Sequence, residues 1–261
     1  MGYKEILRHI EVAEHEAAQL IMEAHGIMAE EKSSRRDVVT EYDRKVQELL
    51  MERLHAALPR AHFFSEEQEQ HDDINAPALF VIDPIDGTMN FVRGLHHSCI
   101  SVAYAEYGEV KAAVIYNPYV DELFTATRGG GAFLNGKPIR VDDALLGETL
   151  VCFGTTPYNP ALAHHCFVLA ERVFAASLDL RREGSAALDL CTVAAGRAGL
   201  YFELALSPWD YAAGMLIVRE AGGVCRTLEG EELRLIAGRT SVVAGGKAAV
   251  EDVFRITQEL R

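Results

Sequence analysis

Two aspartates, Asp83 and Asp86, stand three residues apart after the apolar run 79–82. The run has the length and the β-branched content of a buried strand. Carboxylates at the end of a strand bind hard cations through oxygen. The N–H groups of Gly87 and Thr88, which follow at once, can receive a phosphate at a turn or a helix start. The stretch therefore has the composition of a metal-assisted phosphate site, although Asp-Pro-x-Asp-Gly alone is also a common turn sequence.

A second stretch with the residue types of a site covers 207–214. Ser207 suits a helix N-cap, Pro208 the first helical position and Asp210 the first turn, so the local pattern predicts a helix start. Such a start would hold the Asp210 carboxylate rigidly. The small residues at 212–214 would let another element approach the helix closely.

Other acidic residues have an ordinary explanation when each is taken alone. The doublet Glu66-Glu67 lies in a loop between two predicted strands, where acidic side chains are commonly solvated. Asp43 follows Thr40 with the spacing of a capping box, which predicts a helix start.

The composition is that of an ordinary soluble globular protein. The chain has 261 residues, of which 49% are hydrophobic and 25% charged. This length allows one large core or two closely joined halves. The net charge of −14 argues against direct binding to nucleic acid, which needs basic surfaces. Bound divalent cations would still let an acidic site accept a phosphorylated substrate.

The cysteine pattern and the N-terminus indicate a cytoplasmic protein. The five cysteines lie far apart among apolar residues, with no C-x-x-C pair, so we expect buried free thiols. The N-terminus is too charged for a signal peptide, and no apolar run is long enough to cross a bilayer. We therefore expect no membrane partner.

In the first half, apolar spacing predicts helices over 3–25 and 40–58, with the polar stretch 29–36 as a loop between them. The strands predicted after them cover 62–65, 79–82, 98–106, 109–116, 122–128 and 132–135. Consecutive strands of this kind indicate an antiparallel meander rather than repeated βαβ units.

In the second half, strands and helices alternate. The predicted strands cover 150–154, 178–182, 200–204 and 242–244, and the predicted helices cover 160–175, 185–195, 209–221 and 247–260. No low-complexity linker interrupts the chain. We therefore expect a single domain over 1–261, with an antiparallel α+β half at 1–145 and a mixed α/β half at 146–261.

The stretch 79–91, which extends through Asn90 and Phe91, closely resembles the signature of the inositol monophosphatase family. Members of this family are magnesium-dependent, lithium-sensitive phosphomonoesterases. The sequence Trp-Asp-x-Ala-Ala-Gly at 209–214 resembles the C-terminal signature of the same family. The resemblance covers nearly the whole chain. It implies an α+β fold, a layered αβαβα sandwich of the inositol monophosphatase and fructose bisphosphatase type.

The resemblance also implies roles for individual residues. The metal ligands it implies are Glu66, Asp83, the Ile85 carbonyl, Asp86 and Asp210. The catalytic residues it implies are Thr88, with Asp43 behind it, and Glu66. The substrate-binding residues it implies are Asp86, Gly87, Thr88, Gly184, Ser185, Glu203 and Asp210. Ser65 stands where the family often has glycine before the Glu-Glu pair.

The mechanism that the resemblance implies is two-metal hydrolysis. Asp83 would bridge two Mg²⁺ ions, and a third, weaker Mg²⁺ is usual near the position of Glu66. A metal-bound water oriented by Thr88 would attack phosphorus, while the second metal stabilises the leaving oxygen. Because the carboxylates must be ionised to bind metal, metal affinity should fall at acid pH.

The expected activity is therefore hydrolysis of myo-inositol monophosphate. Relatives that share the chemistry act on other sugar phosphates, fructose bisphosphate, adenosine bisphosphate, NADP or histidinol phosphate, and these remain alternatives. Members of the family are commonly homodimers, so we expect a homodimer. An alternative of another class is an interaction protein, because some bacterial relatives bind transcription machinery. The intact set of acidic residues and Thr88 weighs against a purely non-catalytic role.

Overall fold

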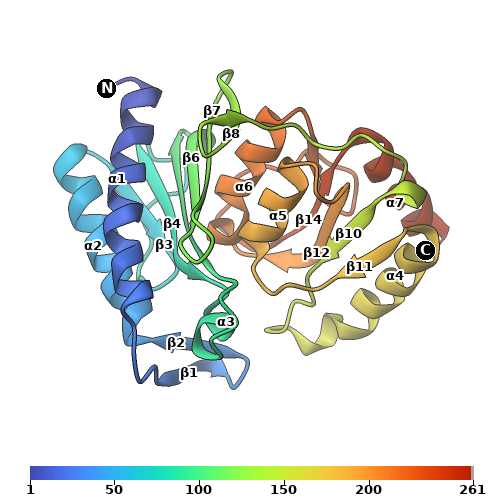
Figure 1. Cartoon of the computed structure of the whole chain (residues 1–261), viewed down its shortest axis with the longest axis horizontal. Helices are drawn as coiled ribbons and strands as arrows, with labels where there is room; N and C mark the ends of the chain where they lie inside the picture. The colour runs from blue at the N-terminus through green and yellow to red at the C-terminus, as the bar shows by residue number, and fades with distance from the viewer. Residues whose placement is uncertain (260–261) are drawn as a thin grey trace.

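The computed structural model describes residues 1–259 and arranges them in five layers (Figure 1). Helices α1 (Tyr3–Met22) and α2 (Glu41–Ala57) form the first layer, on the outer face of a seven-stranded sheet. Helices α5 (Ala186–Ala194) and α6 (Pro208–Glu220) lie between this sheet and a five-stranded one. Helices α4 (Ala163–Ala176) and α7 (Lys247–Glu259) close the far side. The expected α+β fold, an αβαβα sandwich, is confirmed.

The larger sheet follows chain order from β3 to β9. Its strands are β3 (His62–Ser65), β4 (Leu79–Asp86), β5 (Cys99–Glu106), β6 (Glu109–Asn117), β7 (Glu122–Thr127), β8 (Gly131–Leu134) and β9 (Lys137–Pro138). Strand β3 pairs parallel with β4, and all later pairs are antiparallel, so the predicted meander is confirmed. Every residue of β4 is buried, which explains its continuous apolar run.

The smaller sheet has the strand order β11-β10-β12-β14-β13. Its strands are β10 (Leu150–Phe153), β11 (Asp179–Arg181), β12 (Leu200–Leu206), β13 (Val224–Arg226) and β14 (Thr240–Gly245). Strand β10 runs parallel to both of its neighbours, whereas β14 is antiparallel to both of its own. The sheet is therefore mixed, as the alternating pattern predicted. Strand β13, with three residues, was not predicted.

The prediction of a loop at 29–36 is wrong. Strands β1 (Ala29–Ser34) and β2 (Asp37–Thr40) form an antiparallel two-stranded ribbon there. Most of β1 is exposed, so it lacks the apolar alternation that identifies a half-buried strand. The remaining short elements are α3 (Thr88–Val92) and the 3₁₀ turns η1 (Leu146–Glu148) and η2 (Pro160–Leu162).

Helix α6 packs closely against α5, as the small residues at its start predicted. A Cβ at Gly214 would lie only 2.5 Å from Cδ1 of Leu190 on α5, which is closer than atoms can pack. No helix of residues 1–259 is long and apolar enough to cross a membrane.

Candidate active site

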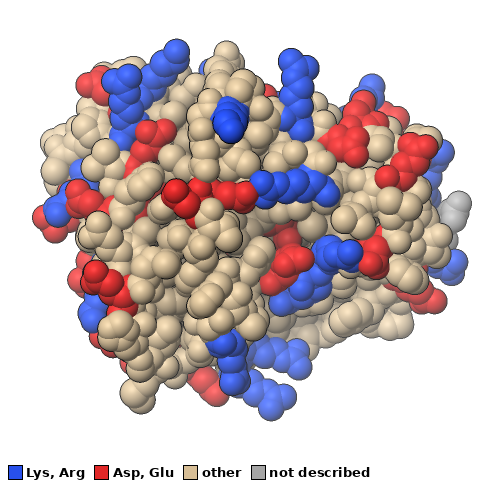
Figure 2. Space-filling model, viewed as in Figure 1, with Lys and Arg blue, Asp and Glu red and all other residues tan. Residues whose placement is uncertain are grey.

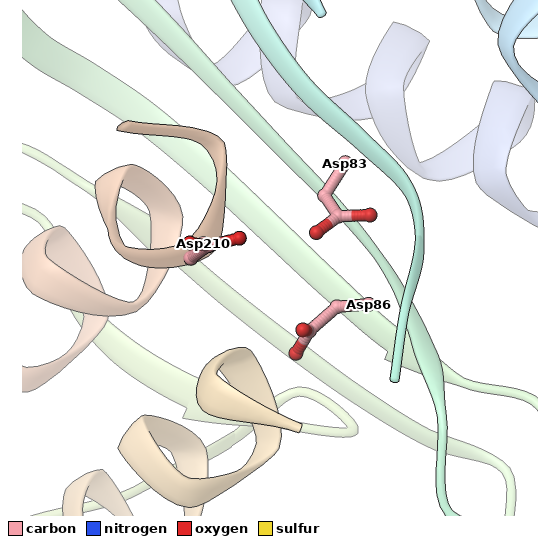
Figure 3. Close-up of side chains that lie close together, drawn as sticks. All are labelled: Asp83, Asp86 and Asp210. Carbon is pink, nitrogen blue, oxygen red and sulfur yellow. The ribbon is translucent and has the colours of Figure 1, made fainter. Parts of the chain in front are cut away.

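Three carboxylates meet between the two halves of the fold. Asp83 and Asp86 come from the C-terminal part of β4, and Asp210 comes from the first turn of α6. Figure 3 shows the three side chains pointing toward one another across the space between these elements. One oxygen from each carboxylate lies within 4.8 Å of the other two. Residues that are far apart in the sequence therefore form one acidic cluster.

Burial and mutual repulsion act on the protonation of this cluster. Burial raises the pKa of Asp83 well above its ordinary value, and the charges of Glu66, Asp86 and Asp210 raise it further. Burial also raises the pKa of Asp86 to about 6, against the hydrogen bonds that favour its ionised form. Without a cation, like charges this close are unfavourable. An oxygen-only cluster of this kind suits a hard divalent cation.

The Asp86 carboxylate also contacts the start of α5. Its Oδ2 accepts hydrogen bonds from the Ser185 hydroxyl at 2.5 Å and from the Ala187 N–H at 2.7 Å. Ser185 is the N-cap of α5, so the helix N-terminus stabilises this negative charge. The structure thus brings Ser185, predicted as a substrate residue, into contact with the cluster.

Gly87 and Gly184 allow two backbone segments to meet beside the cluster. Gly87 has φ +89°, and a Cβ on it would lie 3.1 Å from the His97 carbonyl and 3.3 Å from that of Gly184. Gly184 has φ +92°. Glycine adopts this left-handed conformation without steric cost. The two glycines therefore place the start of α3 against the start of α5.

Thr88 links the cluster to Asp43. Its hydroxyl lies 3.1 Å from Oδ1 of Asp43 and 3.0 Å from the carbonyl oxygen of Ile85. Oδ2 of Asp43 accepts from the N–H and the hydroxyl of Thr40, which confirms the predicted capping box of α2. Burial raises the pKa of Asp43 to about 6, against these hydrogen bonds.

The glutamate doublet follows strand β3, which ends at Ser65 as predicted. Both glutamates contact the ammonium group of Lys32, Glu66 at 2.9 Å and Glu67 at 2.5 Å. Only Glu66 lines the cavity above the aspartates. Lys32 lies on β1, so the unpredicted ribbon contributes a cation to the rim.

A cavity of about 210 Å³ opens beside the aspartate cluster and continues into the space of about 150 Å³ under Glu66. Glu203 on β12 forms part of its wall and accepts hydrogen bonds from the Thr156 N–H at 2.7 Å and the Tyr201 hydroxyl at 2.6 Å. A Cβ at Gly154 would overlap the Glu203 carboxylate, so this wall requires glycine. The predicted residues Gly87, Thr88, Gly184 and Ser185 line the same cavity.

Several further residues of the cavity wall were missed by the sequence analysis. Those with polar or charged side chains include Arg36, Tyr158, Arg182 and Asp189. The first three lie on the ribbon or in connecting segments and carry no local signal. Asp189 does carry one, because it is the single charged residue in the otherwise apolar stretch of α5.

Comparisons with known proteins agree with this geometry. The model of the inositol monophosphatase family matches residues 3–260. The chain is 39% identical over 228 residues to an inositol-1-monophosphatase of Rhizobium meliloti, covering 85% of this chain and 83% of that protein. It is 40% identical over 223 residues to the Nus factor SuhB of Xylella fastidiosa, covering 81% and 80%.

Solved structures show the same relationship. The crystal structure of the extragenic suppressor protein suhB from Bartonella henselae superposes with a TM-score of 0.89 at 33% identity, covering 96% of this chain and 97% of that one. The sequence match, the five-layered fold and the acidic cluster agree. The chain belongs to the inositol monophosphatase family.

Proposed function

We propose that this protein is a Mg²⁺-dependent phosphomonoesterase whose substrate is a myo-inositol monophosphate. The observation that carries the proposal is the convergence of Asp83, Asp86 and Asp210 beside a cavity lined with hydrogen-bonding groups. The sequence relative named inositol-1-monophosphatase supports inositol phosphate as the substrate. Broader sugar-phosphate, fructose bisphosphate or nucleotide phosphatase activity is the alternative within the same chemistry.

The residues present fit a hard metal ion. Glu66, Asp83, the Ile85 carbonyl, Asp86 and Asp210 would hold two to three Mg²⁺ ions through oxygen alone. Bound Mg²⁺ supplies a water of lowered pKa and charge stabilisation for the phosphoryl oxygens. Binding would also relieve the repulsion that raises the pKa of Asp83.

The side chains around the metal ligands have roles of their own in this proposal. The Thr88 hydroxyl can donate its proton to Asp43, which leaves its oxygen lone pairs to accept from the attacking water. The Asp43 carboxylate, held by Thr40, fixes the direction of that hydroxyl. Thr88 would therefore orient the water, and Asp43 would be a positioning residue.

The leaving group would occupy the cavity beside the cluster. Ser185 and the N-terminus of α5 favour negative charge near Asp86, which suits a phosphate ester. Glu203 presents a carboxylate to the cavity for hydroxyl groups of the substrate. Its burial raises its pKa, while Tyr201 and Thr156 oppose that shift by hydrogen bonds to its ionised form.

A substrate panel tests the proposal. The purified protein with Mg²⁺ is given inositol phosphates, sugar phosphates, fructose bisphosphate, nucleotide phosphates and histidinol phosphate, and released phosphate is measured. We expect inositol monophosphate to have the highest kcat/KM, and Asp83→Asn to abolish release. Phosphate release from no member of the panel would overturn the proposal. A clear preference for another substrate would support the proposed phosphatase chemistry but replace inositol monophosphate as the substrate.

The relatives named Nus factor SuhB favour a second candidate, binding to transcription machinery. A pull-down of transcription proteins with the native chain and with Asp86→Asn separates the two functions. Binding that survives in an inactive Asp86→Asn protein would support a non-catalytic role beside the enzyme. On the face seen in Figure 2, acidic and basic side chains are interspersed, which supports a protein or small-molecule partner over nucleic acid.

We also infer a cytoplasmic homodimer. The support for the compartment is that all five cysteines are buried and free. The support for the dimer is family membership alone, and sedimentation of the purified protein tests it.

A further inference from the structure

One buried carboxyl group in the active-site cavity has no assigned role. Asp189, on α5, is only 2% exposed, and its side chain lines the cavity beside the aspartate cluster. Its Oδ1 has no hydrogen-bond partner among the described residues. Buried polar atoms nearly always have a partner, so an unpartnered one on a residue that lines a cavity requires an explanation.

No ion pair to Asp189 is found among residues 1–259. The charges that act most strongly on it are those of Glu203, Asp86 and Glu183, and all three are acidic. The polar neighbour is the Cys152 thiol on β10, a weak donor. A buried carboxyl group without a cationic partner lowers stability relative to an apolar residue of similar size. Packing of α5 therefore does not account for an aspartate at this position.

The other carboxyl groups of the cavity are already engaged. Asp86 accepts from Ser185 and Ala187, and Glu203 accepts from Thr156 and Tyr201. Oδ2 of Asp210 accepts from the Ser207 N–H at 2.7 Å. Asp189 Oδ1 is thus a buried acceptor in the cavity wall that still lacks a donor among residues 1–259.

We propose that Asp189 is a specificity-determining residue whose carboxyl group accepts a hydrogen bond from a hydroxyl group of the leaving polyol. This inference rests on the proposed phosphatase function and adds a hydroxyl contact on α5 to those expected from Glu203. The proposed substrate, a polyol phosphate, supplies hydroxyl groups as hydrogen-bond donors. The substrate class is a phosphate monoester of a polyhydroxylated ring or chain.

Asp189→Leu removes the acceptor and keeps approximately the size of the side chain. We expect kcat/KM for myo-inositol 1-phosphate to fall by about 10- to 100-fold, mainly through KM, as for a buried donor left without its acceptor. For para-nitrophenyl phosphate, which has no hydroxyl groups, we expect a much smaller fall. Asp189→Asn retains a carbonyl oxygen as acceptor and should restore most of the polyol activity. Thr192→Ala, one turn further along α5 and outside the cavity, is the control.

Monodeoxy inositol phosphates identify the contact directly. With the native enzyme, a substrate that lacks one particular hydroxyl group should show about the same loss of kcat/KM as Asp189→Leu causes with the complete substrate. With the variant, removal of that hydroxyl group from the substrate should have no further effect. Asp189→Leu should not lower Tm, because it removes a buried carboxyl group without a cationic partner. If the leucine variant does not fold, Asp189→Ala is used for the same comparison.

The outcomes separate this inference from the proposed function. If no phosphate ester is hydrolysed by the native protein, the phosphatase proposal fails. If esters are hydrolysed and Asp189→Leu lowers kcat/KM for inositol and aryl phosphates equally, or lowers neither, the role of Asp189 is overturned and the phosphatase proposal stands. Sensitivity to the same hydroxyl group in the native and leucine enzymes would also overturn it.

Discussion

The Thr88 hydroxyl lies 3.1 Å from Oδ1 of Asp43, joining the first residue of α3 to the first turn of α2. The other oxygen of the same carboxylate caps α2 through the Thr40 N–H at 2.8 Å. One side chain therefore completes a helix start and holds a hydroxyl beside the aspartate cluster. A structural role and a catalytic role of Asp43 are compatible.

This arrangement predicts the effect of Asp43→Asn. The amide can still accept from Thr40 through its oxygen, but its NH₂ group would donate to Thr88 and reverse that hydrogen bond. We expect kcat to fall by about 10- to 100-fold, as for other residues that orient a metal site from behind. The loss of stability should stay at or below about 1 kcal/mol. Kinetics and thermal unfolding of the variant check both values, and an unchanged kcat would remove Asp43 from the mechanism.

The oxygen-only cluster predicts that activity depends on Mg²⁺. EDTA should abolish phosphate release, and Mg²⁺ should restore it and raise Tm roughly with the logarithm of its concentration above Kd. Li⁺, a small hard cation, should inhibit at concentrations on the order of tens of millimolar, as expected for weak oxygen sites. Full activity in EDTA would contradict the metal mechanism, whereas resistance to Li⁺ would place the enzyme outside the inositol branch.

Asp210→Asn tests the role of Asp210 at the start of α6. Asparagine can accept from the Ser207 N–H as Asp210 does at 2.7 Å, so the capping box should survive. Removing one of three crowded charges should leave Tm of the metal-free protein equal or higher. Activity should be lost because the site lacks a charged ligand. Near-normal kcat with an unchanged Mg²⁺ requirement would reduce Asp210 to a helix cap.

The two glutamates that share Lys32 should respond differently to neutralisation. Glu66 lines the cavity above the aspartates and raises the pKa of Asp83. The Glu67 carboxylate pairs with Lys32, while the Glu67 backbone N–H donates to Oε1 of Gln47. Glu66→Gln should raise the Mg²⁺ requirement sharply and lower kcat by about 10²-fold or more. Glu67→Gln should lower kcat less, because Glu67 would only support the neighbouring ligand. Mg²⁺ titrations of kcat compare them, and a more damaged Glu67→Gln enzyme would reverse the assignment.

The raised pKa values predict opposite pH responses with and without metal. The pKa of Asp43 and that of Asp86 are both about 6, raised first by burial from ordinary values near 4. A carboxyl group whose folded pKa is raised binds its proton more tightly when folded, so metal-free stability should fall as pH rises from about 4 to about 6. Metal binding needs the ionised groups, so the Mg²⁺-dependent increase in Tm should grow over the same range. Thermal unfolding at several pH values, with EDTA or Mg²⁺, measures both slopes.

Much of the fold follows from local pattern. The helices at Glu41–Ala57 and Pro208–Glu220 begin at capping boxes, and the meander strands are apolar runs separated by turn residues. The ribbon β1–β2 was missed because β1 is polar and β2 has only four residues, and β13 has only three. Long apolar patterns therefore identify an element, whereas short strands are identified inconsistently, since β11, also three residues long, was predicted.

The residues of the site also differ in how far the sequence predicts them. Asp83, Asp86 and Asp210 were predicted because the sequences around them resemble the two family signatures, and the fold brings them within 4.8 Å. The Lys32 contact with Glu66 depends on a ribbon that no local signal identifies. Asp189 is conspicuous in an apolar helix, but only the packing of α5 beside the cavity indicates what it faces. Side chains that depend on tertiary placement were not predictable from the sequence.

The absence of a side chain at Gly214 has a consequence for redesign of the enzyme. Because α6 lies against Leu190 with no room for another atom, α5 and α6 are held as one rigid pair, and both begin at the cluster, at Ser185 and Asp210. The spacing of these two side chains is therefore independent of the segment that carries Tyr158, whereas the ribbon that carries Arg36 also holds Lys32 against Glu66. The Tyr158 segment can be lengthened or exchanged to alter which esters are accepted, while the spacing of Ser185 and Asp210 is kept.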